Sequence, residues 1–200
     1  MRSTLEALRS AAASVRYHAA DVRDTAAVGA VLADVYARFG RIDGVIHGAG
    51  VVEDRLITDK TPESFARVYA TKVDGARALA AGLRPDVRFL VLFGSVSGVF
   101  GNRGQADYAA ANDALDALAR HWSGAGAGRV LAVDWGPWAG GGMVSPELER
   151  EYARRGVALI DPADGVACLL AELAAPAGPA QVVYLCGEVP GPSRTGTAGE

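Results

Sequence analysis

The sequence predicts an α/β protein, in which helices cover both faces of a parallel β-sheet. Short apolar runs typical of buried strands alternate along the chain with helical patterns of about 10 to 20 residues. The polar groups that could do chemistry come directly after strands: Asp21, the run His47–Gly50, Ser95 and Pro137. Because parallel strands end at one edge of a sheet, where open sheets bind ligands, we expect these groups to form one composite site.

The first half of the chain carries three helix signals and three strand signals. We expect helices over residues 2–13, 25–38 and 61–83, and strands over residues 15–19, 42–46 and 87–93. Gly40 follows the second helix at the position where a left-handed conformation costs least. Thr61 and Pro62 begin the third helix with a capping side chain and an N1 proline. The stripe expected to bury the second helix consists of Val28, Val31, Leu32, Val35 and Phe39.

The second half repeats this alternation. We expect helices over residues 105–122 and from Ser145 and Asp161 onward, and strands over residues 129–135 and 181–186. The helix that begins at Asp161 carries Val166, Leu169 and Leu170. The chain after Gly187 is rich in Pro, Gly, Ser and Thr, which is typical of disorder. We therefore expect one domain over residues 1–187 and a disordered tail over residues 188–200.

Composition and charge limit the classes of function. Half of the 200 residues are apolar, which suits one domain with a sizeable core. The net charge of −3 argues against nucleic acid or an anionic membrane as the main partner. No apolar run approaches the roughly 18 residues that span a bilayer, and the N-terminus has no signal-peptide core. We therefore expect a cytoplasmic protein.

Cysteines and histidines give no sign of a disulfide framework or a metal site. Cys168 and Cys186 lie in apolar patterns, so we expect two buried thiols rather than a disulfide. The three histidines are scattered and show no metal-ligand spacing.

Ser95 and Tyr108 are the strongest candidates for chemistry. Ser95 leaves an apolar strand, and Tyr108 lies 13 residues later on the next helix, so a loop that folds back would bring the hydroxyl and the phenol together. Asn112 lies one helical turn beyond Tyr108 and shares its face. Such a pair suits polarisation of a carbonyl, because the serine can donate a hydrogen bond and the tyrosine can deliver a proton.

Two other interpretations of this segment fit less well. Ser97 competes with Ser95 as the reactive hydroxyl. The nucleophile elbow of hydrolases places serine third in its five-residue motif, where this chain has Val96. His121 lies on the same predicted helix as Tyr108 and is poorly placed to activate a serine.

The segment GSVSG followed by GQADYAAAN resembles the active-site segment of short-chain dehydrogenases/reductases, specifically that of the ketoreductase domains of polyketide and polyunsaturated-fatty-acid synthases. That subfamily places an asparagine four residues after the tyrosine and takes its lysine from an earlier helix. Thr71–Ala76 matches the earlier segment, so the resemblance implies a role for Lys72. The spacing of the family favours Ser95 over Ser97. The resemblance covers about residues 5–187 and implies NADPH-dependent reduction of a β-ketoacyl thioester bound to an acyl carrier protein.

Lys72 allows two interpretations. A cation near the phenol would favour the phenolate and move the pKa of Tyr108 toward operating pH, and it could also bind the nicotinamide ribose. The alternative is a solvated helix lysine. The chain contains only two lysines, Lys60 and Lys72, and Lys72 lies on a largely apolar helix, which favours the functional role. Asn112 is either an exposed helix amide or, as the resemblance implies, the group that holds the lysine in place.

The resemblance also implies a set of cofactor contacts. The run from His47 to Gly50 would lie beside the adenosine ribose, where glycine lets the backbone approach a flat ligand. By themselves these glycines indicate a tight turn after a strand, and Asp21 indicates a helix cap. The residues that the resemblance assigns to NADPH are Asp21, Val22, His47, Gly48, Ala49, Gly50, Lys72, Tyr108, Pro137 and Trp138.

Other segments bear on the substrate. Val52–Asp54 stands where many ketoreductases carry Leu-Asp-Asp, a fingerprint linked to a D-hydroxy product, although only Asp54 matches it. Phe100 stands where the opposite stereochemical class tends to carry tryptophan, so the resemblance favours the D product. An acidic turn is the alternative for Glu53 and Asp54, and a simple loop is the alternative to a lid hinge at Gly140–Gly142. The residues assigned to substrate and stereocontrol are Glu53, Asp54, Phe100, Gly141 and Met143.

The resemblance implies a partial Rossmann-like, doubly wound parallel sheet that lacks the first two strands and the glycine-rich phosphate loop. No Gly-x-Gly-x-x-Gly follows any predicted strand, although that loop normally holds the pyrophosphate. The strand that ends at Ala19 would lose its neighbour, and would either pair beside the His47 strand or detach. Two hypotheses stay open: a β-ketoacyl reductase, or a non-catalytic fragment or subunit that needs a partner to supply the phosphate loop.

Overall fold

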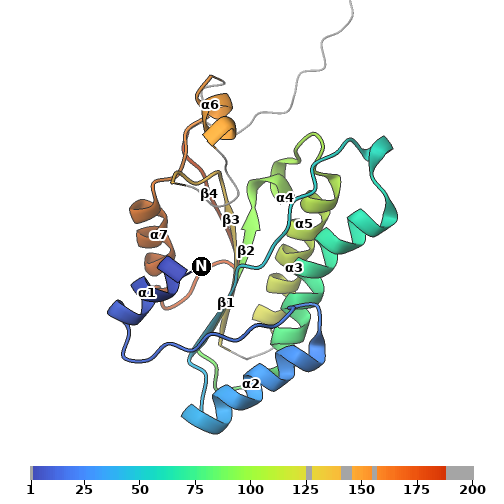
Figure 1. The fold of residues 1–200 in the computed structure, drawn as a ribbon. Helices are drawn as coiled ribbons and strands as arrows, with labels where there is room; N and C mark the ends of the chain where they lie inside the picture. The colour runs from blue at the N-terminus through green and yellow to red at the C-terminus, as the bar shows by residue number, and fades with distance from the viewer. Residues whose placement is uncertain (1, 125–127, 141–145, 155–156, 188–200) are drawn as a thin grey trace, which may run out of the picture.

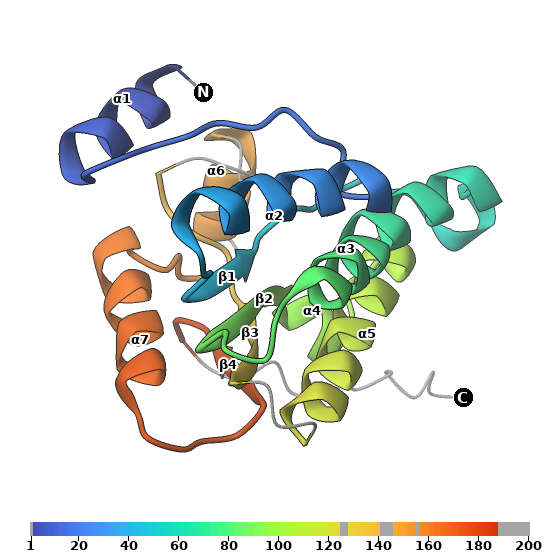
Figure 2. The ribbon, with the colours of Figure 1, turned by 90° about the horizontal axis from the view of Figure 1, so that it is seen from below.

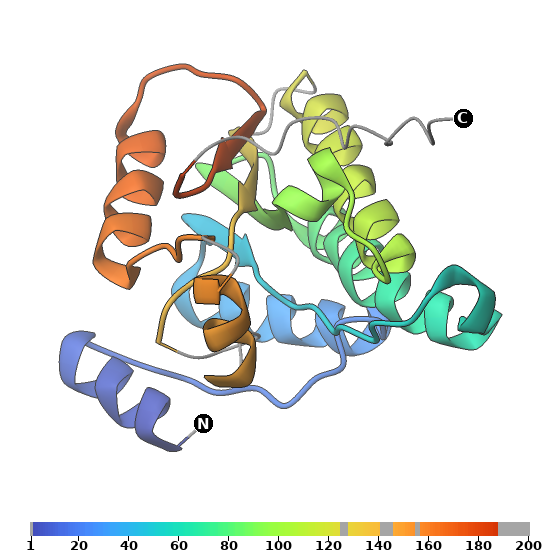
Figure 3. The ribbon, with the colours of Figure 1, turned by 90° about the horizontal axis from the view of Figure 1, so that it is seen from above.

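Four parallel strands form one sheet in the computed structural model, which describes residues 2–124, 128–140, 146–154 and 157–187. Their order in space follows their order in the chain: β1 (Gly44–His47), β2 (Phe89–Ser95), β3 (Arg129–Trp135) and β4 (Gln181–Tyr184). Strand β3 has the bounds that the sequence predicts. The parallel α/β architecture is therefore confirmed, and the carboxyl ends of the strands meet at the edge seen in Figure 3.

Helices cover both faces of the sheet (Figures 1 and 2). On one face α3 (Pro62–Gly82) and α5 (Ala106–Ser123) lie side by side, and α2 (Thr25–Phe39) packs beside α3. The other face is covered by α7 (Pro162–Ala174), with α1 (Arg2–Ala11) farther out on the same side. Shorter elements complete the described chain: a 3₁₀ turn (Ile57–Asp59), α4 (Val96–Phe100) and α6 (Pro146–Arg154).

Strand β2 shows how the sheet divides the core. Leu90 and Leu92 point to α3 and α5, whereas Val91 and Phe93 point to α7. This alternation follows from the two-residue period of a strand. A strand buried on both faces is apolar at every position, which is why this run carries a clear strand signal.

The predicted C-terminal end of α2 and the predicted N-terminal end of α3 are confirmed. Gly40 has φ 78° and its N–H donates to the Tyr36 carbonyl, so α2 ends in the left-handed conformation that glycine tolerates. The Thr61 hydroxyl accepts a hydrogen bond from the Ser64 N–H, and Pro62 occupies the first helical position.

The strand expected over residues 15–19 does not form. The chain from residue 14 to residue 21 has no regular secondary structure, and within the described chain no strand pairs with the outer edge of β1. Of the two alternatives for this segment, detachment is the one observed. Because residues 14–21 pair with no strand, they have no ladder hydrogen bonds, and the pattern of this segment by itself does not form a strand.

The burial of several apolar side chains also differs from the prediction. Phe39 is 55% exposed, and Tyr36 takes the inner position on α2, where its hydroxyl accepts a hydrogen bond from the Arg84 N–H. On α7, Val166 and Leu170 are exposed because only the side of the helix that carries Leu169 faces the sheet.

The expectation of two buried thiols is wrong. Cys168 is half-buried on α7, and Cys186 is exposed beyond the end of β4. Both are free thiols, so the described chain contains no disulfide between them. Cys186 lies where the pattern of the last strand continues past the hydrogen-bonded part of the sheet.

Candidate active site

Ser95 ends β2 and caps the short helix α4. Its Oγ lies 2.8 Å from the Ser97 Oγ and accepts a hydrogen bond from the Ser97 N–H at 3.3 Å. The sequence predicts a loop here, whereas one helical turn reverses the chain and brings it back along β2. Gly98 lets α4 lie against α5, because a Cβ there would stand 2.8 Å from the Asn112 Cβ. Ser95 is thereby held at the carboxyl edge of the sheet.

Tyr108 lies in the first turn of α5 and is 8% exposed. Burial raises the pKa of its phenol, and hydrogen bonding from the side chains of Asn112 and Ser95 acts in the opposite direction. The structure therefore brings Ser95 and Tyr108 together, as the sequence predicts. The expected shift of this pKa toward operating pH is wrong for the protein described here, because desolvation of the phenolate outweighs the opposing contacts. A phenol that keeps its proton is the form needed in a proton donor.

Lys72 is buried in α3 with 3% of its surface exposed, which excludes a solvated lysine. Its Nζ donates to the Phe93 carbonyl at 2.8 Å and lies 5.3 Å from the centroid of the Tyr108 ring. Burial lowers the pKa of Lys72 to about 8, and attraction to Asp134 and Asp116 opposes that shift. The Lys72 ammonium therefore lies next to the Tyr108 ring, as the sequence predicts.

Asn112 is fully buried rather than exposed. Its Nδ2 donates to the backbone carbonyl of Tyr108 at 2.7 Å, while its Oδ1 has no hydrogen-bond partner in the part of the chain that the structure describes. Asn112 therefore fixes the turn of α5 that carries Tyr108. A direct hydrogen bond from Lys72 to this amide is not among the contacts of the described residues.

His47 and Val22 both pack against α3. The His47 Nε2 donates to the Lys72 carbonyl at 2.8 Å, and burial lowers the pKa of the imidazole, which keeps it neutral. A Cβ at Gly75 would lie 3.0 Å from the His47 ring and 3.1 Å from the Val22 side chain, so this glycine permits the close packing. The His47 side chain is therefore structural, whereas the half-buried or exposed backbone of Gly48–Gly50 stays accessible beyond it.

The remaining cofactor candidates are Asp21, which precedes α2, and Pro137 and Trp138, which follow β3. Asp21 is exposed and paired with Arg23 at 2.6 Å, an interaction that lowers its pKa to about 2; Asp24, not Asp21, caps α2. Trp138 packs edge-on against Trp135 with ring centroids 4.8 Å apart. The Pro137 carbonyl accepts a hydrogen bond from the Ile160 N–H at 2.8 Å, so this segment is fixed on the α7 side of the sheet.

Among the predicted stereocontrol residues, Glu53 and Asp54 lie on a segment that is bound to the start of α5 through Lys60 and Gln105. Glu53 accepts hydrogen bonds from Ser64 at 2.6 Å and from Arg67 at 2.8 Å, which lower its pKa to about 2. Asp54 accepts a hydrogen bond from the Gln105 Nε2 at 3.0 Å, and its charge acts on Tyr108. Phe100 is 39% exposed at the end of α4. Gly141 and Met143 lie outside the described residues.

Two groups of polar residues were missed by sequence reasoning. Lys60 and Asp107 form an almost fully buried ion pair of 2.7 Å, and the Lys60 Nζ also donates to the Glu53 carbonyl. This pair fastens the Glu53 segment to the helix that carries Tyr108. In the second group, Gln181 donates hydrogen bonds to Asp116 and Asp134, and both aspartates attract the Lys72 ammonium. The only sequence signal of this group is a charged residue inside an apolar run.

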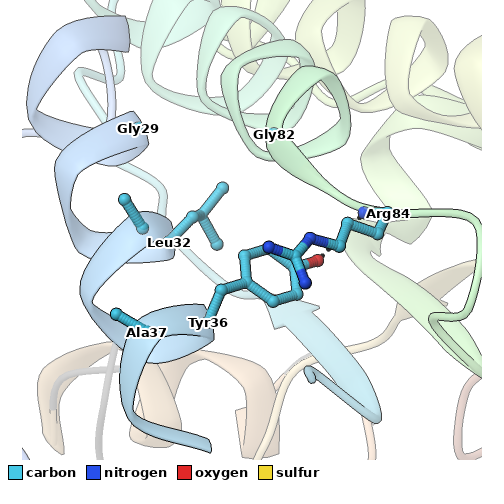
Figure 4. Close-up of a pocket in the computed structure, with 7 residues that line it drawn as sticks. Gly29, Leu32, Tyr36, Ala37, Gly82 and Arg84 are labelled. Atoms are coloured by element: carbon cyan, nitrogen blue, oxygen red, sulfur yellow. Dashed lines mark hydrogen bonds between the residues drawn. The ribbon is translucent and has the colours of Figure 1, made fainter. Parts of the chain in front are cut away.

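A groove of about 380 Å³ lies between α2 and α3 (Figure 4). Leu32, Tyr36, Gly82 and Arg84 are among its lining residues, and the Arg84 guanidinium stacks on the Tyr36 ring. Gly82 and Arg84 precede β2, whereas Ser95 ends it, so the groove lies at the opposite end of the sheet from the candidate site. Within the described residues there is no cluster of three potential metal ligands and no helix long and apolar enough to cross a bilayer.

Known proteins share this fold and sequence. A family model described as "KR domain" matches residues 1–140. A polyunsaturated fatty acid synthase protein of Thraustochytrium sp. is 36% identical over 92% of this chain and 6% of that protein. The spectinabilin polyketide synthase system protein NorB of Streptomyces orinoci is 41% identical over 86% of this chain and 8% of that protein. By sequence, this chain is therefore similar to the KR domain family and to parts of polyunsaturated fatty acid and polyketide synthase proteins.

Solved structures agree with the sequence matches. The ketoreductase from the first module of phoslactomycin biosynthesis in Streptomyces sp. HK803 is 37% identical with a TM-score of 0.84, over 91% of this chain and 42% of that chain. This chain therefore spans less than half of that solved ketoreductase and less than a tenth of the two synthase proteins. The sheet, the placement of Ser95, Tyr108 and Lys72, and these matches lead to one conclusion: the chain belongs to the KR domain family, the ketoreductases of polyketide and related synthases, within the Rossmann-like short-chain dehydrogenase/reductase fold.

Proposed function

We propose that this chain reduces a β-ketoacyl thioester, carried by an acyl carrier protein, to the β-hydroxyacyl thioester with NADPH as the reductant. Membership of the ketoreductase family supports reduction of a ketoacyl group. The observation that carries the proposal is the buried Lys72 ammonium, 5.3 Å from the ring of Tyr108, next to a phenol that also interacts with Ser95. A hydroxyl, a phenol and a cation at one point can polarise a carbonyl and protonate it.

The residues present fit the nicotinamide end of the cofactor. An ammonium has three donors, and in the described chain the Lys72 Nζ has one hydrogen-bond acceptor, the Phe93 carbonyl, which leaves donors for a ribose hydroxyl. We assign the nicotinamide ribose to Tyr108 and Lys72, and the nicotinamide side to Pro137 and Trp138. The adenosine half is assigned to Asp21, Val22 and the run from His47 to Gly50. When bound, the cofactor supplies a hydride to the carbonyl carbon.

Each side chain then has a separate task. The Ser95 hydroxyl donates a hydrogen bond to the substrate carbonyl oxygen and orients it. Tyr108 keeps its proton at neutral pH, because burial raises its pKa, and gives that proton to the oxygen as negative charge develops there. Lys72 stabilises the phenolate that remains, and Asn112 positions Tyr108 through the backbone carbonyl that it binds.

The substrate is assigned to the segment that precedes α3 and to the end of α4. Glu53 and Asp54 lie on the segment that Lys60 fastens to α5, and Phe100 ends α4 nearby. We assign these three residues, with Gly141 and Met143, to substrate binding and stereocontrol, and we expect the D-hydroxy product. The carrier protein is the partner that would bring the thioester to this edge.

A second candidate function is a non-catalytic subunit that needs a partner. The observation that favours it is the outer edge of β1, which pairs with no strand in the described chain and leaves Ile46 50% exposed. The chain also contains no Gly-x-Gly-x-x-Gly to hold the pyrophosphate of the cofactor. A separate polypeptide could supply a strand that pairs with β1 and a glycine-rich loop that holds the pyrophosphate.

Calorimetric titration with NADPH distinguishes the two candidates. Micromolar binding by this chain alone supports the reductase. No binding by this chain alone, followed by binding when the glycine-rich N-terminal half of a related ketoreductase is added, supports the second candidate. No binding in either mixture contradicts the cofactor assignment.

A further inference from the structure

Two aspartates meet in the interior directly below the candidate site. Asp116 comes from α5 and Asp134 from β3, and they are 1% and 0% exposed. Gln181, the first residue of β4, donates through the same Nε2 to an oxygen of each, at 2.9 Å to Asp116 and 2.8 Å to Asp134. One amide nitrogen can reach both carboxyl groups only if they lie side by side.

The pair cannot hold two negative charges at neutral pH. The Oδ1 atoms of both aspartates are buried and have no donor within the described residues. Burial raises the pKa of both carboxyl groups, that of Asp116 to about 8, and repulsion between them adds to the shift of Asp116. A hydrogen bond between two carboxyl groups requires a proton on one of them. The geometry and the burial of the pair therefore favour one shared proton and one negative charge.

The fold places this charge next to the catalytic groups. Asp134 pairs in register with Gly94, and a Cβ at Gly94 would overlap the Asp134 Oδ1, so the glycine makes room for the carboxyl group. The backbone N–H of Ser95 favours the ionised form of Asp134. On α5, Asp116 lies one turn beyond Asn112 and two turns beyond Tyr108, on the same buried face.

Other titratable groups around Lys72 do not supply a buried negative charge. His47 faces it from β1 and is kept neutral by burial, and Tyr108 faces it from α5 as a neutral phenol. Arg120 and Asp113, on the exposed side of α5, act on Asp116 with opposite signs. Within the described chain, the attractions that oppose the desolvation of Lys72 come from Asp134 and Asp116.

We propose that Asp116 and Asp134 share one proton and together provide the single negative charge that keeps Lys72 an ammonium in its buried position. Both are positioning residues, because they act through Lys72 and Ser95 rather than on the substrate. Their role in the reaction rests on the proposed function. The charge relation itself does not, and it can be measured without activity.

The two lysines of the chain make a direct test possible. Protein labelled with ¹⁵N-lysine gives two Nζ signals, from Lys60 and Lys72, which can be followed during a pH titration by NMR. Asp116→Asn and Asp134→Asn each leave one ionisable carboxyl group, so each should keep the charge and shift the Lys72 titration by less than about 0.5 units. The double variant removes the charge and should lower the Lys72 titration by about one unit. The Lys60 signal is the internal control, because its partner Asp107 is unchanged.

Several outcomes would overturn the proposal. A Lys72 titration that is the same in the double variant and the wild type excludes the dyad as its counter-charge. A full shift in each single variant means that the charge is not shared. If the double variant does not fold, ¹³C-labelled aspartate in the wild type decides: one carboxyl group protonated at pH 7 supports the dyad, and ionisation of both below pH 5 overturns it. If the titrations give the expected results but the protein reduces no ketone, the proposed function is wrong and the charge relation stands.

Discussion

The interior and the open edge of the sheet differ in how deeply their side chains are buried. On the inner side, made of β2, β3, α3 and α5, charged side chains such as Lys72 and Asp134 are almost fully buried and held by named partners. On the open edge, made of β1 and residues 12–23, Ile46 is half exposed and the expected strand lies free of the sheet. The groups that we assign to the carbonyl and the nicotinamide ribose belong to the inner side, and the adenosine half is assigned to the open edge. Pro137 and Trp138, assigned to the nicotinamide, lie on the α7 side. The difference separates the part of the proposed site that is built from buried side chains from the part that is exposed.

The largest difference in stability that we expect is between the loss of a buried ion pair and the loss of an exposed one. Lys60→Met leaves Asp107 buried and unpaired, so the free energy of unfolding should fall by about 3–5 kcal/mol. Arg16→Met is the control on the open edge, because the Arg16–Asp34 pair is about 40% exposed on each side and should cost at most about 1 kcal/mol. Urea denaturation measures both. Equal losses would show that the two sides do not differ in this way.

Apolar truncation gives the next comparison. Leu92→Ala removes a fully buried side chain of β2 and should cost about 2–5 kcal/mol in the same measurement. Ile46→Ala, on β1, should cost much less, about 1 kcal/mol, because half of that side chain is already in water. A larger loss at Ile46 than at Leu92 would mean that the open edge is covered in solution.

Glycine substitutions sharpen the claim that space is reserved below the site. Gly94→Ala forces a methyl group onto the Asp134 carboxyl group, and we expect a loss of about 1–3 kcal/mol in unfolding free energy. Gly29→Ala, on the exposed face of α2, meets no atom within 4 Å and should stabilise the protein by up to about 1 kcal/mol, since alanine favours helix. If Gly94→Ala is as well tolerated as Gly29→Ala, no space is reserved at Gly94 for the Asp134 carboxyl group.

The last comparison is a pH dependence of stability. The pKa of Asp116 is raised in the folded protein, so the folded state binds a proton that the unfolded chain releases near its ordinary value. The stabilisation from this group is therefore full below about pH 4 and is lost as pH rises toward about 8. Asp116→Asn should flatten this part of the curve of unfolding free energy against pH. An unchanged slope in the variant would contradict the raised pKa.

Much of the fold was predictable because its signals are local. The apolar run of β3 and the cap at Thr61 each arise within a few residues, and both appear where expected. The convergence of Ser95 and Tyr108 also followed, since the chain that leaves β2 must fold back to place the next helix against the sheet. The strand over residues 15–19 failed because its formation depends on a neighbour rather than on its own pattern.

The residues that were missed depend on contacts across the sheet. Asp134 lies in an apolar run, and its partners come from α5 and β4, so nothing local indicates that Asp116 and Gln181 meet there. The direction of the pKa shift at Tyr108 was unpredictable for a similar reason, because it depends on how deeply α4 and α5 bury the phenol. The sequence identifies these groups, but burial decides their charge.

The most direct test of the account is the rate at which Tyr108→Phe reduces a β-ketoacyl thioester with NADPH, compared with the wild type. This variant removes only the hydroxyl, and Tyr17→Phe, at an exposed position, is the matched control. We predict a loss of about 100-fold or more at Tyr108, with no change at Tyr17. A Tyr108→Phe protein that folds and reduces the ketone at the wild-type rate would contradict the assignment of this phenol as the proton donor.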